Sequence, residues 1–291
     1  MERAFIVGVN LDGDSNFELS MDELASLAQA CEMEVVGRAE QNMEYANTAT
    51  YIGAGKDIVI FDNALSPVQL RNLQRELDKP VMDRTTLILE IFSTRAKTRE
   101  AKLQVEVARL QYMLPRLVGL HDALSRQGGA SGAMSNKGAG EKKLELDRRR
   151  LEQRLTNMKR ELDLIAGERR TQRQKRARSG IPRVALVGYT NAGKSTIMNM
   201  LLGAYVKDEE KQVLEKDMLF ATLGPTVRKL ELSDGRNAVL TDTVGFIRKL
   251  PHHLIEAFKS TLDEAISADV LVHVIDCADP DMEAHIAVVD K

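Results

Sequence analysis

The residues whose types and spacing suggest chemistry lie in the second half of the chain, where a glycine-rich loop follows a short apolar run. The apolar run is Val184–Val187, and the loop Gly188–Ser195 has the spacing GxxxxGK[ST]. Because the residues from Thr196 to Leu202 are compatible with a helix, the loop has the strand–loop–helix setting of a phosphate-binding loop. A chance glycine turn can produce the spacing, but the two flanks together favour a phosphate site.

Each residue type in this loop has a physical reason to be there. Gly188 and Gly193 allow backbone conformations that bring successive N–H groups around a phosphate. Lys194 places an ammonium against the β- and γ-phosphate oxygens, Ser195 offers a hydroxyl to Mg²⁺, and the helix N-terminus adds the positive end of its dipole. The predicted nucleotide-binding residues of the loop are Gly188, Tyr189, Thr190, Asn191, Ala192, Gly193, Lys194, Ser195 and Thr196.

A second motif further along the chain also fits a triphosphate and its metal. The run Ala238–Thr241 is typical of a strand and continues into Asp242-Thr243-Val244-Gly245. An aspartate at a strand end can hold the Mg²⁺ shell, and the N–H of Gly245 can meet a γ-phosphate. Such an aspartate is common for ordinary turn reasons, but its position downstream of the phosphate loop favours the metal interpretation.

Between the two motifs lies a segment with two threonines, Phe220-Ala221-Thr222-Leu223-Gly224-Pro225-Thr226. One threonine is expected to close over the metal when triphosphate is bound and to release it on hydrolysis. The residue pattern alone leaves Thr222 and Thr226 as alternatives.

The composition is that of an ordinary globular protein with room for about two domains. The 291 residues carry 41 Lys+Arg against 43 Asp+Glu, and this net charge of -2 excludes a generally basic nucleic-acid coat and a generally acidic tail. Aromatic residues make up 4% and Trp is absent, which argues against binding by rows of stacked rings. Cys31 and Cys277 form neither a metal pair nor a disulfide framework, no apolar run reaches the length of a membrane span, and the first residues lack a signal peptide. We therefore expect a cytoplasmic protein.

The beginning of the chain alternates short apolar runs with helical patterns, which predicts a small N-terminal α/β domain at 1–95. Strands are expected at Phe5–Val9, Val35–Val36, Ile58–Phe61 and Val81–Met82, and a helix that Ser66 and Pro67 begin is expected over Val68–Leu77.

One connection in this domain is unusual. Tyr51–Lys56 leads almost directly into the strand that begins near Asp57, although a parallel crossover needs about a dozen residues or more. Either a tight antiparallel turn joins the strands here, or residues are missing between Lys56 and Asp57. The glycines of Gly53–Lys56 could also contact nucleotide phosphates, but a plain turn is the favoured interpretation.

The strand signal disappears over 96–180, where two leucine-rich stripes predict a long antiparallel helical hairpin. The stripes occupy 103–117 and 151–165, and we expect them to pack against each other. The Gly-, Ala- and Ser-rich segment 125–141 forms the predicted tip loop, and Pro115 is expected to kink or interrupt the first arm.

Positive charge gathers in the second arm of this hairpin. From Glu141 to Arg178 there are 14 Lys/Arg against 7 Asp/Glu, and the stretch Arg169–Arg178 has six positive residues and no acid. A solvated face with i,i+4 ion pairs explains Glu152–Lys159. Because Arg169–Arg178 contains no acid to pair with, contact with phosphate is the favoured interpretation there.

These motifs together resemble the HflX GTPases, a family of ribosome-associated translation factors. The resemblance covers nearly the whole chain, and the combination of motifs is highly specific. The residues that carry it are Gly188–Ser195 with Asn191, FATLGPT at 220–226, DTVGFIRKLP at 242–251, DNALSPVQLRNL at 62–73, DRTTLILEIF at 83–92, AKLQVEVARLQYMLPRL at 101–117 and LSRQGG at 124–129. The expected fold is α/β, with the N-terminal domain and the hairpin followed by an incomplete P-loop GTPase domain at 181–291.

The resemblance implies hydrolysis of GTP with Mg²⁺, and it implies Thr222 rather than Thr226 as the switch threonine. It further implies that the N-terminal domain and the hairpin bind the large ribosomal subunit, that the tip reaches the peptidyl-transferase centre, and that the protein splits ribosomes. GTP and GDP are expected ligands, ATP is a further candidate at the N-terminal domain, and a monomer is expected. The predicted catalytic residues are Lys194, Thr222 and Gly245, and the predicted metal ligands are Ser195, Thr222 and Asp242. The nucleotide contacts predicted outside the phosphate loop are Phe220, Ala221, Thr222, Leu223, Gly224, Asp242, Thr243, Val244 and Gly245.

Four features depart from the family pattern. Gly224 stands where the family usually has Asp, and the tip loop GGASGAMSNKGAGEKKLE differs from the sequence that the family usually has there. The helix expected between Lys56 and Asp57 is absent, and no guanine-reading NKxD motif occurs before Lys291. The preference for GTP over ATP therefore comes from the resemblance, and we expect the chain to be a fragment.

One catalytic role, the orientation of the attacking water, has no clear residue in this sequence. Phe246 occupies the position of a water-orienting glutamine and has no hydrogen-bonding group, so the free protein is expected to hydrolyse GTP slowly until a partner or a monovalent cation completes the site. Asn191 is equally compatible with holding K⁺ near the phosphates and with hydrogen bonding inside the loop. The alternative function is a non-catalytic RNA-binding module whose nucleotide site only sets conformation. A third interpretation, a membrane-associated or tRNA-modifying GTPase, is not favoured, because this sequence lacks the membrane span or the modification domain that such a protein requires.

Overall fold

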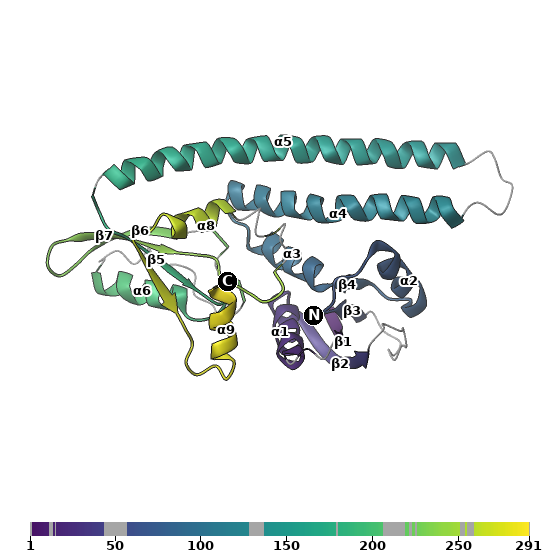
Figure 1. Cartoon of the computed structure of the whole chain (residues 1–291), viewed down its shortest axis with the longest axis horizontal. Helices are drawn as coiled ribbons and strands as arrows, with labels where there is room; N and C mark the ends of the chain where they lie inside the picture. The colour runs from purple at the N-terminus through teal and green to yellow at the C-terminus, as the bar shows by residue number, and fades with distance from the viewer. Residues whose placement is uncertain are drawn as a thin grey trace. The chain divides into compact units, whose positions relative to one another are not determined.

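The computed structural model groups the chain into two compact units, the first made of Met1–Glu90 with Glu106–Glu161 and the second of Ile91–Val105 with Leu162–Lys291. The predicted α/β class is confirmed, with two sheets and a helical hairpin (Figure 1). The division of the chain at 95 and 180 into three domains stays a prediction. The structure describes residues 2–11, 14, 16–43, 57–127, 137–178, 180–205, 219–220, 223–224, 226–250, 254 and 259–290.

The first unit contains a sheet of four parallel strands in the order β2-β1-β3-β4. The predicted helix begins as expected, because the Ser66 side chain accepts from the N–H of Gln69 and the Gln69 side chain accepts in return, a capping box that fixes its first turn. The elements are β1 (Glu2–Leu11), α1 (Phe17–Ala30), β2 (Met33–Met43), β3 (Asp57–Phe61), α2 (Pro67–Leu77), β4 (Val81–Asp83) and α3 (Arg84–Arg95).

The strand pairing corrects one expectation. Both β2 and β3 run parallel to β1, on opposite sides of it, so a tight antiparallel turn does not join β2 to β3. The connecting residues 44–56, which include Gly53–Lys56, lie outside the described part of the chain.

The alternation of side chains along β1 places its two faces against different layers. Ala4 and Ile6 are buried on one face, and a Cβ built at Gly8 on that face would lie 2.3 Å from the sulfur of Met21 in α1. A side chain at position 8 would therefore force the Met21 and Phe17 side chains of α1 to shift. On the other face, Val7 packs with Val59, Phe61, Leu65, Leu73 and Val81 in the core beneath α2.

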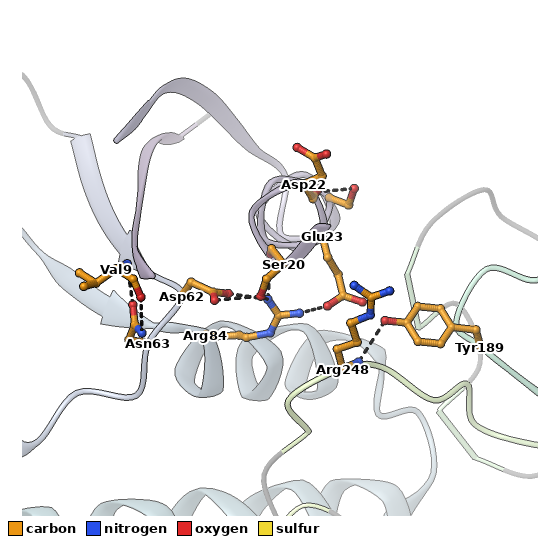
Figure 2. A network of polar contacts seen from close by, with 10 residues as sticks. Val9, Ser20, Asp22, Glu23, Asp62, Asn63, Arg84, Tyr189 and Arg248 are labelled. Carbon is orange, nitrogen blue, oxygen red and sulfur yellow. Dashed lines mark hydrogen bonds and ion pairs between the residues drawn. The ribbon is translucent and has the colours of Figure 1, made fainter. Parts of the chain in front are cut away.

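Side chains from three elements form a buried ion network at the carboxyl end of this sheet (Figure 2). Arg84 Nη1 donates to Asp62 Oδ1 at 2.6 Å and to the Ser20 carbonyl at 3.1 Å, while Nη2 contacts Glu23. Ser20 Oγ donates to Asp62 Oδ2 at 2.9 Å. Because the Arg84 and Asp62 side chains are 3% and 0% exposed, each buried charge depends on the other for compensation. The network joins α1, the end of β3 and the start of α3.

A second buried carboxylate attaches the hairpin to the same sheet. Asp83 accepts hydrogen bonds from Thr86 at its own helix start, from Tyr112 in α4, and from Arg116 Nη2 at 2.6 Å. Burial acts to raise the pKa of Asp83, but these hydrogen bonds outweigh it and the pKa is lowered overall. The ionised Asp83 therefore holds the first hairpin arm against the N-terminal sheet.

The hairpin consists of α4 (Arg99–Gln127) and α5 (Lys137–Arg178), which run antiparallel side by side (Figure 1). Within the first unit, Arg154 of α5 pairs with Glu106 of α4 at 2.9 Å. The helix α4 continues through Pro115, so of the two expected outcomes an interruption is wrong, and a kink stays a prediction. The helices also extend into both ends of the predicted tip segment 125–141, whose residues 128–136 lie outside the described part of the chain.

The second unit contains a four-stranded sheet in the order β6-β7-β5-β8, in which β6 is antiparallel to β7 and the other neighbours are parallel. Met198 and Leu202 of α6 pack onto this sheet beside Leu186 and Leu240. No helix among the described residues has the length and apolar character needed to cross a membrane. The elements are β5 (Arg183–Gly188), α6 (Lys194–Tyr205), β6 (Thr226–Glu231), β7 (Asn237–Asp242), α8 (Lys259–Ile266), β8 (Val270–Val274) and α9 (Met282–Val289).

The ion network of the first unit predicts a large stability effect. Replacing Asp62 by alanine removes a carboxylate from the buried Arg84 guanidinium, so we expect Asp62→Ala to lower the free energy of unfolding by about 3–5 kcal/mol. Urea denaturation followed by circular dichroism measures this loss. Arg75→Ala removes an exposed pair with Glu76 and is the control, with an expected change below about 1 kcal/mol. Equal effects of the two variants would contradict the assignment.

Candidate phosphate-binding site

The loop between β5 and α6 has the backbone that its glycines suggest. Gly188 has φ +154°, and a Cβ there would lie 2.4 Å from the Val274 carbonyl oxygen of β8. Gly193 has φ +87° with open space around it, so conformation rather than crowding requires glycine there. Asn191 also adopts a left-handed φ of +61°, which asparagine tolerates better than most residues. The loop thus turns sharply from the strand end into the helix start.

The ammonium of Lys194 is buried inside this loop. Its Nζ donates to the carbonyls of Gly188 at 3.2 Å and Tyr189 at 2.6 Å, and the residue is only 7% exposed. Burial lowers the pKa of Lys194 to about 8, although the nearby Asp242 carboxylate acts to raise it. A phosphate at the loop would supply the negative charge that stabilises this ammonium.

A hydroxyl and a carboxylate meet beside the loop. Ser195 Oγ donates to Asp242 Oδ2 at 2.7 Å, and Asp242 is fully buried. The two come together because β5 and β7 are parallel neighbours whose carboxyl ends share one sheet edge. Hard oxygen donors of this kind suit Mg²⁺, which keeps several waters and phosphate oxygens in its shell. Among the residues described, no cluster of three or more His, Cys, Asp or Glu could hold a metal ion.

The segment after Asp242 lies directly against the loop. The N–H of Phe246 donates to the Gly188 carbonyl at 3.1 Å, and the N–H of Thr190 donates to the Phe246 carbonyl at 2.8 Å. A Cβ at Gly245 would lie 2.6 Å from Thr190 Cα and 3.0 Å from Lys194 Nζ. Glycine is therefore required at 245 by close packing. Thr243 and Val244 are buried, and Thr243 Oγ1 donates to the Leu186 carbonyl at 2.7 Å, which attaches the segment to β5.

Tyr189 makes two contacts that the sequence did not indicate. Its hydroxyl accepts from the N–H of Arg248 at 3.0 Å (Figure 2). Its ring stacks on the imidazole of His285 in α9, with centroids 3.7 Å apart and planes 12° apart. Burial lowers the pKa of His285 even though Asp279 lies 3.4 Å from its Nδ1. No local spacing connects these residues, because they come from three separate segments of the chain.

The structure describes the predicted switch segment in part. The N–H of Phe220 donates to Thr190 Oγ1 at 2.9 Å, and Phe220 and Leu223 are buried. Gly224 is half-buried and Thr196 is exposed at the helix surface. Ala221 and Thr222 lie outside the described residues, so the predicted threonine ligand is not among the groups brought together here.

The basic stretch requires one correction. Arg169 Nη2 pairs with Glu100 of α4 at 2.6 Å, so this arginine has an acidic partner on the other arm of the hairpin. Its neighbour Arg170 is exposed. The interpretation of Arg169–Arg178 as a stretch with no acid to pair with is therefore wrong for Arg169, because the partner lies far away in sequence.

Family models match three consecutive parts of the chain. Residues 18–93 match the GTP-binding GTPase N-terminal model, residues 95–176 match the GTP-binding GTPase Middle Region, and residues 183–291 match the 50S ribosome-binding GTPase model. Together the three cover most of the chain, in the same order as its predicted parts.

Individual relatives agree with these models. The chain is 47% identical over 301 residues to the GTPase HflX of Lacrimispora saccharolytica, covering 99% of this chain and 69% of the relative. It is 40% identical to the GTPase HflX of Escherichia coli, covering 99% and 68%. Among solved structures, the crystal structure of a GTP-binding protein from Sulfolobus solfataricus in complex with GDP is similar, with a TM-score of 0.50, 26% identity and coverage of 99% of this chain and 75% of that one.

The packing of Gly245 predicts a specific loss of binding. Gly245→Ala places a methyl group against Thr190 and Lys194, so we expect affinity for fluorescent GDP to fall roughly tenfold or more, since overpacking costs about 1–3 kcal/mol. Gly203→Ala is the matched control, because a Cβ at Gly203 in α6 meets no atom within 4 Å. Wild-type affinity in Gly245→Ala would show that the segment moves freely away from the loop.

The burial of Lys194 predicts a pH dependence. With its pKa near 8 in the free protein, the ammonium is about nine-tenths protonated at pH 7 and about one-tenth at pH 9. Because phosphate favours the charged form, GDP binding is expected to take up protons near pH 8, and affinity is expected to fall as pH rises toward 9. Calorimetry in two buffers of different ionisation enthalpy measures the uptake. Lys194→Arg stays protonated and is the control without uptake; zero uptake by the wild type would contradict this account.

Proposed function

Since the chain belongs to the HflX family of GTPases and is itself a GTPase of this ribosome-associated family, we propose that it binds the large ribosomal subunit and splits ribosomes into subunits. The single observation that supports the catalytic half of this proposal is the geometry at the end of β5. There a buried ammonium, a helix N-terminus and the Ser195–Asp242 pair converge on one sheet edge.

We assign the catalytic roles to side chains and backbone of this chain. Lys194 neutralises charge on the phosphates, and the N–H of Gly245 meets the terminal phosphate. Ser195 and Asp242, with Thr222, are the proposed ligands of Mg²⁺. The metal would neutralise charge that develops on the phosphate oxygens. Because Phe246 cannot orient water through its side chain, turnover by the free protein is expected to be slow, and the ribosome is the partner that raises it.

The hairpin supports the ribosomal half of the proposal. The 42 residues of α5 span about 60 Å at the helical rise, and the Asp83 contacts attach the first arm to the N-terminal sheet. A long arm with an exposed Arg170 and further basic residues near its end suits the phosphate backbone of ribosomal RNA. The proposed tip, 128–136 with its flanks, would enter the peptidyl-transferase centre. ATP binding at the N-terminal domain and a monomeric state stay predictions.

Two variants of the full chain separate ribosome binding from splitting. Replacing Arg170, Arg173, Lys175, Arg176 and Arg178 by glutamine is expected to weaken binding to purified large subunits and to flatten its salt dependence, because fewer counterions are released. Shortening 128–136 is expected to keep much of that affinity and to abolish splitting, measured by light scattering of intact ribosomes with GTP. GTP turnover that large subunits fail to stimulate, or normal splitting without the tip, would refute the proposal. The alternative of a non-catalytic module predicts binding without turnover.

Asn191 supports a second proposed cofactor, K⁺, near the phosphates. If its side chain positions K⁺, GTP turnover in KCl is expected to exceed turnover in NaCl at equal ionic strength, and Asn191→Ala is expected to remove that difference. Equal rates in the two salts would leave Asn191 as a residue that shapes the loop through its left-handed backbone.

A further inference from the structure

A contact between two phenylalanines connects the switch segment to the helix that leads into the hairpin. The rings of Phe92 in α3 and Phe220 meet edge-on, with centroids 4.7 Å apart and planes at 88°. The two residues are 1% and 2% exposed. Edge-to-face packing of two buried rings fixes their relative orientation in addition to excluding water. Phe92 lies upstream of both hairpin arms, so this contact joins parts of the chain that are far apart in sequence.

The backbone of Phe220 is restrained as well. Its φ of +56° is left-handed, a conformation that a bulky aromatic residue seldom adopts. Its N–H donates to Thr190 Oγ1 in the phosphate loop at 2.9 Å. Such a conformation persists only where surrounding contacts impose it. Among the described residues, the contacts that Phe220 makes include one with the Thr190 hydroxyl and one with the Phe92 ring.

Phe92 is also linked to the start of the hairpin, where α4 begins at Arg99. The helices α3 and α4 are separated only by residues 96–98, and Thr98 holds the turn by accepting from the N–H of Ala101 at 3.1 Å and of Lys102 at 3.0 Å. At the start of α4, Glu100 is 7% exposed and pairs with Arg169 of α5 at 2.6 Å. A short, capped connection and a largely buried ion pair therefore link Phe92 to both arms.

We propose that Phe92 of α3, far from the phosphate loop in sequence, is a positioning residue for GTP hydrolysis. It holds Phe220 in the left-handed conformation in which the Phe220 N–H donates to Thr190 Oγ1, and so it restrains the phosphate loop at Thr190. This inference rests on the proposed role of the phosphate loop in GTP hydrolysis. Phe92 acts through Phe220, whose N–H donates to Thr190 in the phosphate loop, and Phe92 lies in the helix that directly precedes α4.

The test compares Phe92→Leu, Phe220→Leu and the double variant in the full chain. Leucine keeps both sites apolar but removes the rings. Each single variant is expected to lower intrinsic kcat for GTP about tenfold and to leave KM and GDP affinity within about twofold, since a buried ring pair is worth up to about one order of magnitude. Because both substitutions break one contact, the double variant is expected to be no slower than the slower single variant.

A matched control separates positioning from general destabilisation. Ile91 is 0% exposed in the same helix and has no ring. Ile91→Ala is therefore expected to lower the melting temperature at least as much as Phe92→Leu while leaving kcat unchanged. Wild-type kcat in Phe92→Leu, or single effects that multiply in the double variant, would overturn the inference. If large subunits do not stimulate the wild type but Phe92→Leu still lowers intrinsic kcat, the proposed function fails and the inference stands.

Discussion

A single buried charge, the ammonium of Lys194, is the constraint around which the phosphate site is arranged. Two loop carbonyls accept its hydrogen bonds and the Asp242 carboxylate lies nearby, yet burial still lowers its pKa to about 8. A buried cation of this kind is stabilised further by an anion in the loop. The same ammonium limits the neighbouring segment, because any side chain at Gly245 would collide with it and with Thr190.

The position of Asp242 follows from sheet topology. Its strand, β7, lies parallel beside β5, so the carboxylate emerges at the same edge as the loop that contains Ser195. The helix α6 begins at this edge, and the first N–H groups of a helix have no carbonyl partner within it. Ammonium, hydroxyl, carboxylate and helix start are thus brought together by two neighbouring strands, an arrangement suited to a nucleotide with its metal.

In the first unit, buried charges are also compensated by neighbouring groups, and there they hold helices against the sheet. Asp62 and Arg84 compensate each other at the sheet edge, and Asp83 accepts from Tyr112 and Arg116 on the hairpin. Removing either member of such a pair leaves an uncompensated charge, so these contacts tolerate little displacement. These contacts therefore attach the first arm of the hairpin to the N-terminal sheet.

The sequence by itself determined the phosphate loop, the Asp242–Gly245 motif, the hairpin and most strands, because each depends on local spacing or on a short-range period. It also determined the family, through motifs spread along nearly the whole chain. Only the tertiary structure decided the parallel pairing of β3 with β1, the pairing of Arg169 with Glu100, the stacking of Tyr189 on His285 and the contact of Phe92 with Phe220. These contacts join residues far apart in the chain, and the partner of a charge or a ring has no local period from which it could be predicted.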